Sequence, residues 1–276
     1  MDFSIQDVLF AFSITMLAGL STGTGSFIAV FARRTNIKFL SFSLGFSAGV
    51  MIYVSFVEIF PKALETLTST LGEKHGNYMT VLSFFLGMLF IALIDKLIPS
   101  FENPHELPAV SEIKELKSGP ALTGAGHRLH RVGIFTALAI AVHNFPEGLA
   151  TFLVAVRDPA LGITIAIAIA IHNIPEGIAV SVPIYYATGN RKRAFYFSFL
   201  SGMAEPLGAI IGFLILLPFM SDIIFGIMFS AVAGIMVFIS LDELLPSAQE
   251  YGEHHLSIYG LVLGMIVMAA SLVIMI

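Results

Sequence analysis

The sequence predicts an all-α integral membrane protein with eight transmembrane helices. Hydrophobic residues make up 57% of the 276 residues and charged residues only 12%, about half the charged share of a typical soluble domain. The apolar residues also gather into runs of about 20 or more, the length that a helix needs to cross a bilayer. Because backbone polar groups in lipid have no water to bind, such runs must form helices.

The apolar runs divide the whole chain, residues 1–276, into one transmembrane domain. The segment before the first run lacks the basic residues of a cleavable signal, so this run is predicted to remain as a span. The longest polar stretch, 100–130, is predicted to be a cytoplasmic loop. The eight predicted spans are approximately residues 7–32, 38–61, 77–99, 131–156, 159–187, 194–218, 222–247 and 257–276.

Basic residues indicate how the spans are oriented, because cytoplasmic loops carry an excess of Lys and Arg. The first, third and fifth loops hold 11 of the 14 Lys and Arg residues, and the second and fourth loops hold Lys62, Lys74 and Arg157. Both termini are therefore predicted to lie outside. The seventh loop has no Lys or Arg but carries His254 and His255, which are candidates to receive ions at the inner surface.

Composition excludes several classes of site and partner. The chain has no cysteine, so disulfides, iron–sulfur clusters and thiolate zinc sites are ruled out, and a metal ion must be held by nitrogen and oxygen. The net charge of -5 and the lack of a basic run give no support for binding nucleic acid.

The sequence repeats itself twice, and each pair of repeats runs in opposite directions through the bilayer. Residues 139–150 and 168–179 are identical at nine of twelve positions and lie on consecutive spans. Residues 48–65 and 233–250 are identical at eight of eighteen positions, at a constant offset of 185, and lie five spans apart. Inverted repeats of this kind are typical of secondary transporters, whose sites lie near the midplane. A symmetric protein without a transport role remains an alternative.

Each short repeat contains the pattern His-Asn-x-Pro-Glu, at residues 143–147 and 172–176. Residues four apart share one face of a helix, so His and Glu of each pattern lie on one stripe, which the Asn flanks. The proline removes a backbone hydrogen bond and kinks the helix. The carbonyl that it frees is a further oxygen ligand beside the His, Asn and Glu.

Three carboxylates, Glu147, Glu176 and Glu205, fall inside predicted spans. A charged side chain at the bilayer centre costs about 2.5–3.5 kcal/mol, so three unpaired ones would cost roughly 8–10 kcal/mol. Bound cations would neutralise them. The alternative is that these groups are structural polar contacts between helices.

The candidate ligands favour a transition metal. Imidazole suits zinc, iron, copper and nickel, whereas carboxylate and amide oxygens suit manganese and harder ions. Seven ligands are too many for one ion, and two adjacent sites bridged by Glu147 and Glu176 would use them all. The candidate metal ligands are His143, Asn144, Glu147, His172, Asn173, Glu176 and Glu205. The loop histidines His105, His127 and His130 are read equally as further ligands or as solvated side chains.

These motifs resemble the signature helices of the ZIP (Zrt/Irt-like) metal transporters, in particular the bacterial ZupT branch. The resemblance rests on His-Asn-Phe-Pro-Glu-Gly at 143–148, His-Asn-Ile-Pro-Glu-Gly at 172–177 and Glu205-Pro206, and it extends over the whole chain. It implies a 3+2+3 helix arrangement and a binuclear site. One ion would be held by His143, Glu147, His172 and Glu176, and the other by Asn144, Glu147, Asn173, Glu176 and Glu205.

The resemblance also implies a function. The chain would take up divalent transition-metal ions across the cytoplasmic (inner) membrane, with zinc first and iron, manganese, cobalt and cadmium as further cargo. Other branches of the family have Glu and His where this chain has Asn173 and Glu176, a departure that fits a broader ion range. The expected partners are the metal ions and the lipid bilayer, and a homodimer stays open.

A second reading from another class is a membrane-embedded di-metal enzyme, in which paired carboxylates and histidines activate water or oxygen. Helix-borne Glu and His ligands do form catalytic di-iron sites. The inverted repeats favour the transporter, because an enzyme does not need them. The sequence therefore predicts no enzymatic activity and no catalytic cofactor.

Overall fold

The computed structural model describes residues 4–31, 37–97, 124–216, 219–251 and 254–275, and within these ranges it is helical with no strand. Three of the elements, designated η, are short π-helical turns within longer helices. The elements are α1 (Ile5–Phe31), α2 (Ile37–Val54), η1 (Ser55–Ile59), α3 (Phe60–Leu71), α4 (Glu73–Leu97), α6 (Gly124–Arg157), α7 (Pro159–Thr188), α8 (Arg191–Gly202), α9 (Ala204–Ile211), η3 (Gly212–Leu216), α10 (Asp222–Ile239), η5 (Ser240–Leu244), α11 (Leu245–Tyr251) and α12 (His254–Met275).

The predicted all-α membrane class is confirmed. Seven helical stretches of the described residues are long and apolar enough to cross a membrane, and the fourth predicted span lies on the 34-residue helix α6. Two helices extend beyond the predicted span and loop boundaries. The second span continues past Pro61 to Leu71, because a proline is tolerated in the first turn of α3. The loop predicted for 100–130 ends earlier, since α6 begins at Gly124.

Several predicted features of the third loop cannot be compared with the structure. His105 lies outside the described residues, as do the side chains of His127 and His130.

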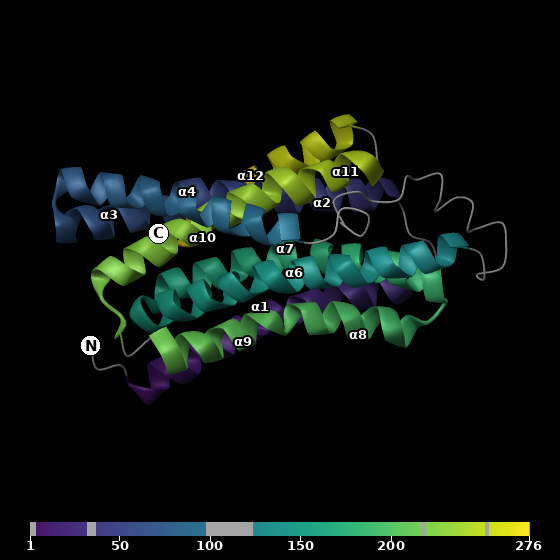
Figure 1. Ribbon diagram of the computed structural model, residues 1–276, viewed down its shortest axis with the longest axis horizontal. Coiled ribbons are helices and arrows are strands. Elements are labelled where there is room, and N and C mark those ends of the chain that lie inside the picture. The colour runs from purple at the N-terminus through teal and green to yellow at the C-terminus, as the bar shows by residue number, and fades with distance from the viewer. Residues whose placement is uncertain (1–3, 32–36, 98–123, 217–218, 252–253, 276) are drawn as a thin grey trace.

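The helices pack into two layers (Figure 1). One layer contains α1, α6, α7, α8 and α9, which correspond to the first, fourth, fifth and sixth spans. The other contains α2, α3, α4, α10, α11 and α12, which correspond to the second, third, seventh and eighth. The layers meet where α2 packs against α7 and α10 against α6. Along the chain, the fourth and fifth spans lie between the first three and the last three, as in the 3+2+3 arrangement. In space, each layer contains four of the spans.

The long inverted repeat has a structural counterpart in two π-helical turns. η1 begins at Ser55 and η5 at Ser240, which differ by the offset of 185 that relates the two sequences. Each turn is followed by a proline, Pro61 or Pro246. Because proline cannot donate to the carbonyl four residues earlier, it disrupts the α-helical ladder, and a π-helical turn accommodates the disruption. Each turn also contains a glutamate, Glu58 or Glu243.

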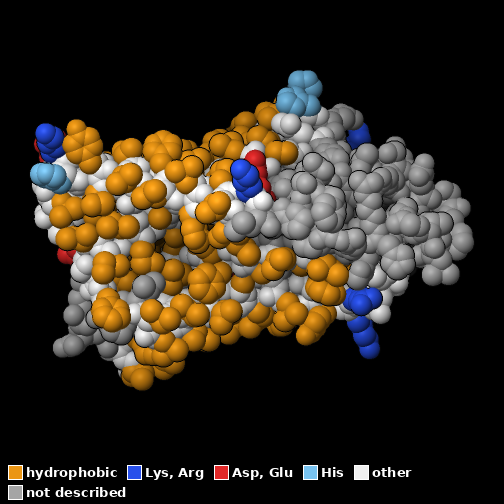
Figure 2. Space-filling model, in the orientation of Figure 1, with side chains coloured by type: hydrophobic (Ala, Val, Ile, Leu, Met, Phe, Trp, Pro, Cys, Tyr) orange, Lys and Arg blue, Asp and Glu red, His pale blue; other side chains and the backbone are white. Residues whose placement is uncertain are grey.

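The surface has the polarity that lipid requires. Hydrophobic side chains cover the long face in view, and most of the charged side chains in view lie toward its two ends (Figure 2). Leu17, Leu89, Leu214 and Ile266 are more than half exposed. In a bilayer these side chains would meet hydrocarbon.

Glycines bring the first span close to one of the motif helices. A Cβ added to Gly25 of α1 would collide with the carbonyl of Ile174, and one added to Gly177 of α7 would collide with the carbonyl of Thr22. Small residues allow helix backbones to approach closely in membranes. Helix α1 therefore supports α7 directly beside the second His-Asn-x-Pro-Glu pattern.

Candidate metal site

The two motif helices form an antiparallel hairpin. Only Asp158 separates α6 from α7, and its side chain accepts a hydrogen bond from the backbone N–H of Leu161 at 3.1 Å, which caps α7. Both helices continue through their internal prolines. His143 and His172 lie 15 and 14 residues from Asp158, or about 21 Å along each helix at 1.5 Å per residue. The hairpin therefore places both patterns at the same depth.

The histidine of each pattern contacts the glutamate of the other. His143 Nε2 lies 3.2 Å from Glu176 Oε2, and His172 Nε2 lies 3.3 Å from Glu147 Oε2. All four side chains are at most 1% exposed. On each helix the His and Glu lie on one face, as their spacing of four residues predicts. This face of α6 is turned toward the equivalent face of α7.

The two asparagines and Glu205 extend this cluster toward α8 and α9. The Asn173 amide donates to the Ala18 carbonyl at 3.0 Å and also to Glu205 Oε1. The Asn144 amide donates to the Ser201 carbonyl at 3.2 Å. Both asparagines are fully buried.

A break in the sixth span places Glu205. Helix α8 ends at Gly202 and α9 begins at Ala204, since Pro206 cannot donate to the Gly202 carbonyl. Glu205 therefore lies in the first turn of α9, where the helix dipole favours a negative charge, and it is fully buried.

Every one of the seven candidate ligands has a buried polar atom with no hydrogen-bond partner among the described residues. Buried polar atoms in folded proteins nearly always have a partner, so seven exceptions in one cluster mark a place where another group can bind. The atoms are His143 Nδ1, Asn144 Oδ1, Glu147 Oε1, His172 Nδ1, Asn173 Oδ1, Glu176 Oε1 and Glu205 Oε2.

Glu243 is a member of the cluster that the sequence analysis did not include. It lies in η5 of the opposite layer, is 8% exposed, and its Oε2 is 3.8 Å from His143 Nδ1. It lies near the end of the seventh predicted span, 222–247. The long repeat and Pro246 are the sequence features that could have identified Glu243, because together they mark an irregular turn in the helix.

The second layer makes another contact with the motif. The Ser47 hydroxyl of α2 donates to the His172 carbonyl at 3.3 Å. With Glu243 beside His143, both halves of the cluster therefore lie against the other layer. A shift between the layers would change the surroundings of both histidines.

The arrangement pairs the acidic and basic groups with each other. Within the described residues, no three His, Asp or Glu side chains are placed to enclose a metal ion. An ion would have to separate the His–Glu pairs, after which imidazole nitrogen and carboxylate and amide oxygen would be available as ligands. Because such ligands bind in their deprotonated forms, metal binding would release protons.

These features define a class: an all-α membrane protein with buried, ionisable and unsatisfied side chains at mid-span. Ionisable residues inside a membrane mark ion pathways, and inverted repeats that meet at such residues are typical of transporters. A family model described as "ZIP Zinc transporter" matches residues 7–124 and 112–272. The chain belongs to this family.

Curated relatives match nearly the whole chain. A protein of Lysinibacillus sphaericus (strain C3-41) named "Zinc transporter ZupT" is 64% identical over 270 residues, which cover 98% of this chain and 99% of the relative. Proteins with the same name from Clostridium perfringens (strain 13 / Type A) and Streptococcus mutans serotype c are each 60% identical. Their alignments cover 99% and 98% of this chain and 98% and 99% of those relatives.

Proposed function

We propose that this chain carries divalent transition-metal ions, zinc first among them, across the cytoplasmic membrane into the cell. The observation that carries the proposal is the cluster of seven buried side chains with nitrogen and oxygen ligands, each with an unpartnered atom, on helices α6, α7 and α9. Three carboxylates at this depth are costly without cations. Family membership and the names of the relatives support zinc as cargo.

The site is proposed to be binuclear. His143 and His172 would hold one ion, and Asn144, Asn173 and Glu205 would hold the other, with Glu147 and Glu176 shared between them. The division is supported by the contacts, since the histidines pair with the two motif glutamates whereas Asn173 pairs with Glu205. Each motif glutamate has one oxygen beside a histidine and a second oxygen that is unpartnered.

The cargo is proposed to include iron, manganese, cobalt and cadmium as well as zinc. The donor set has imidazole for zinc-like ions and amide and carboxylate oxygen for manganese-like ions, and it has no thiolate. No covalent chemistry is proposed.

Uptake of radioactive zinc into proteoliposomes tests this function. Glu147→Gln and Glu176→Gln should each reduce uptake to the level of empty liposomes, because each removes a shared carboxylate, whereas the exposed Glu65 offers a matched control as Glu65→Gln. Full uptake by either site variant would contradict the proposal. The alternative, a di-metal enzyme, predicts that the intact protein does not accumulate zinc in the vesicles.

Ion range is a separate prediction. Replacing Asn173 by Glu adds a charged ligand beside Glu205, so we expect the ratio of zinc to manganese uptake to change at least several-fold while some transport remains. Competition between ions in the same vesicles measures the ratio. An unchanged ratio would argue that Asn173 is not a ligand.

A further inference from the structure

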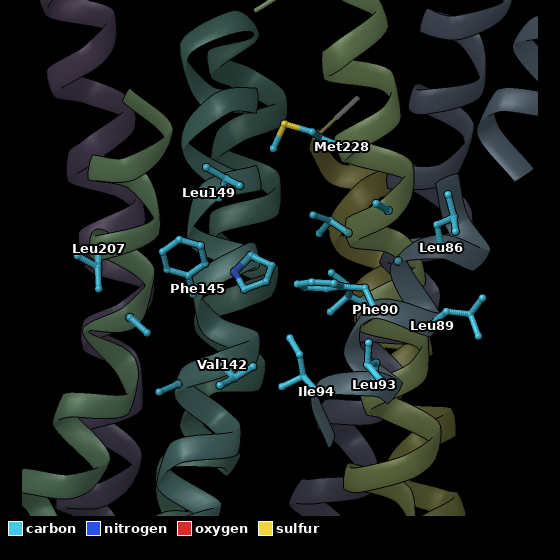
Figure 3. Close-up of a pocket in the computed structure, with 17 residues that line it drawn as sticks. Leu86, Leu89, Phe90, Leu93, Ile94, Val142, Phe145, Leu149, Leu207 and Met228 are labelled. Atoms are coloured by element: carbon cyan, nitrogen blue, oxygen red, sulfur yellow. The ribbon is translucent and has the colours of Figure 1, made fainter. Parts of the chain in front are cut away.

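A large apolar groove lies between the two layers, away from the paired ligands. It has a volume of about 930 Å³, toward the upper end of the roughly 300–1,000 Å³ of known ligand pockets. Helices α4 and α10 form one side, and α6 and α9 form the other (Figure 3). Every lining residue is apolar or glycine.

The groove is open to the surroundings of the protein. Leu89, Leu93 and Leu207, which line it, are each more than half exposed. They lie on membrane-spanning stretches, where the surroundings are hydrocarbon rather than water. An apolar hollow of this size loses dispersion contacts if nothing fills it, so its natural occupant is an acyl chain.

A basic residue, Lys96, lies beyond one end of the groove on α4. Leu89, Leu93 and Lys96 are spaced by four and three residues on α4 and therefore share one helix face. Lys96 is exposed and has no ion pair with another described residue, whereas the neighbouring Asp95 lies on a different face. In the predicted orientation Lys96 is at the inner surface, where anionic lipid headgroups attract basic residues.

The groove also lies against the face of α6 that points away from the candidate ligands. Val142, Phe145 and Pro146 line it, and they alternate along α6 with the candidate ligands His143, Asn144 and Glu147. An occupant would therefore pack directly behind the ligands without touching them.

We infer that this groove binds an anionic phospholipid of the inner leaflet. One acyl chain lies between α4 and α6, and the phosphate contacts Lys96. The inference depends on the membrane class of the protein and not on which ion it carries.

Native mass spectrometry of the purified full-length chain, delipidated and then exposed to phosphatidylglycerol or phosphatidylcholine, tests the inference. The intact protein should retain one phosphatidylglycerol about fivefold more tightly than phosphatidylcholine, the effect expected of one Lys near the surface. Lys96→Gln should remove this preference, and Lys192→Gln, at another exposed inner-loop position, should keep it. Equal retention of the two lipids by the intact protein would overturn the assignment of the headgroup.

A second pair of variants tests the acyl chain. Ala231→Phe places a ring in the groove and should reduce retention of both lipids, whereas Ala270→Phe, on the exposed face of α12, should not. If Ala231→Phe does not fold, Leu89→Trp replaces it in the test, because the larger side chain narrows the groove from its open side. If Leu89→Trp retains lipid as the intact protein does, the groove is not the binding site.

Discussion

At the scale of single residues, the candidate site is a set of reciprocal contacts between helices. His143 and Glu147 occupy one face of α6, but each lies beside a partner on α7. The pairing gives each histidine and glutamate a polar partner and leaves one oxygen of each glutamate unpartnered. This combination suits a transporter, because a site that binds its cargo too firmly cannot release it.

Glu243 adds a carboxylate from the other layer to this set. We expect Glu243→Gln to reduce zinc uptake several-fold, since it removes the negative charge 3.8 Å from His143 Nδ1. Asp242→Asn, an exposed neighbour in the same π-helical turn, is the matched control. Uptake rates in proteoliposomes measure both. Equal effects of the two variants would argue against a specific role for Glu243.

At the scale of elements, the ends of α6 and α10 are joined across the layers. Arg157 Nη2 lies 2.7 Å from Asp222 Oδ1, and the guanidinium lies 4.6 Å from the centre of the Phe225 ring. These residues line a polar pocket of about 290 Å³ that also includes Lys62 and Thr66. In the predicted orientation the pocket is on the outer side, where the contact joins the two layers.

Breaking this contact should open the outer side. The ion pair is partly exposed and contributes about 0.2–1 kcal/mol, and the cation–π contact adds about 0.5–1 kcal/mol. In a Thr66→Cys background, Arg157→Gln should therefore raise the rate of labelling by an impermeant maleimide a few-fold. Lys74→Gln changes an exposed residue of α4 that does not line the pocket and should leave the rate unchanged. No increase for Arg157→Gln would show that the contact does not restrict access.

At the scale of the whole molecule, spans that are related by an inverted repeat lie in the same layer. The long repeat relates the second span to the seventh and the short repeat relates the fourth to the fifth, and each of these pairs lies within one layer. The π-helical turns η1 and η5 preserve this relation. The ligand cluster lies in one layer, and the other layer reaches it through Ser47 and Glu243.

The orientation of the molecule is a prediction from its basic residues, and the absence of cysteine makes it simple to test. In intact cells, Ser4→Cys should react with an impermeant maleimide, whereas Lys192→Cys should react only after the membrane is permeabilised. Both positions are exposed. The reverse pattern would place both termini in the cytoplasm and contradict the predicted direction.

Much of the site could be predicted because its chemistry is local in sequence. The His-Asn-x-Pro-Glu patterns lie within five residues each, and a helix converts that spacing into one polar stripe. Glu243 could not be placed in the same way. Its contact with His143 depends on a π-helical turn in a helix that is distant in sequence, and one additional residue in a turn rotates the following side chains to a different face.

By itself, the sequence determined the class of the protein and proposed its candidate ligands. Composition and periodicity are properties of single segments, and lipid leaves an apolar segment of this length no alternative to a helix. Only the tertiary structure decided that each histidine faces the glutamate of the other repeat, that Glu243 joins them, and that a groove lies behind α6. These depend on which faces of different helices meet, and that choice is made by close packing between segments far apart in the chain.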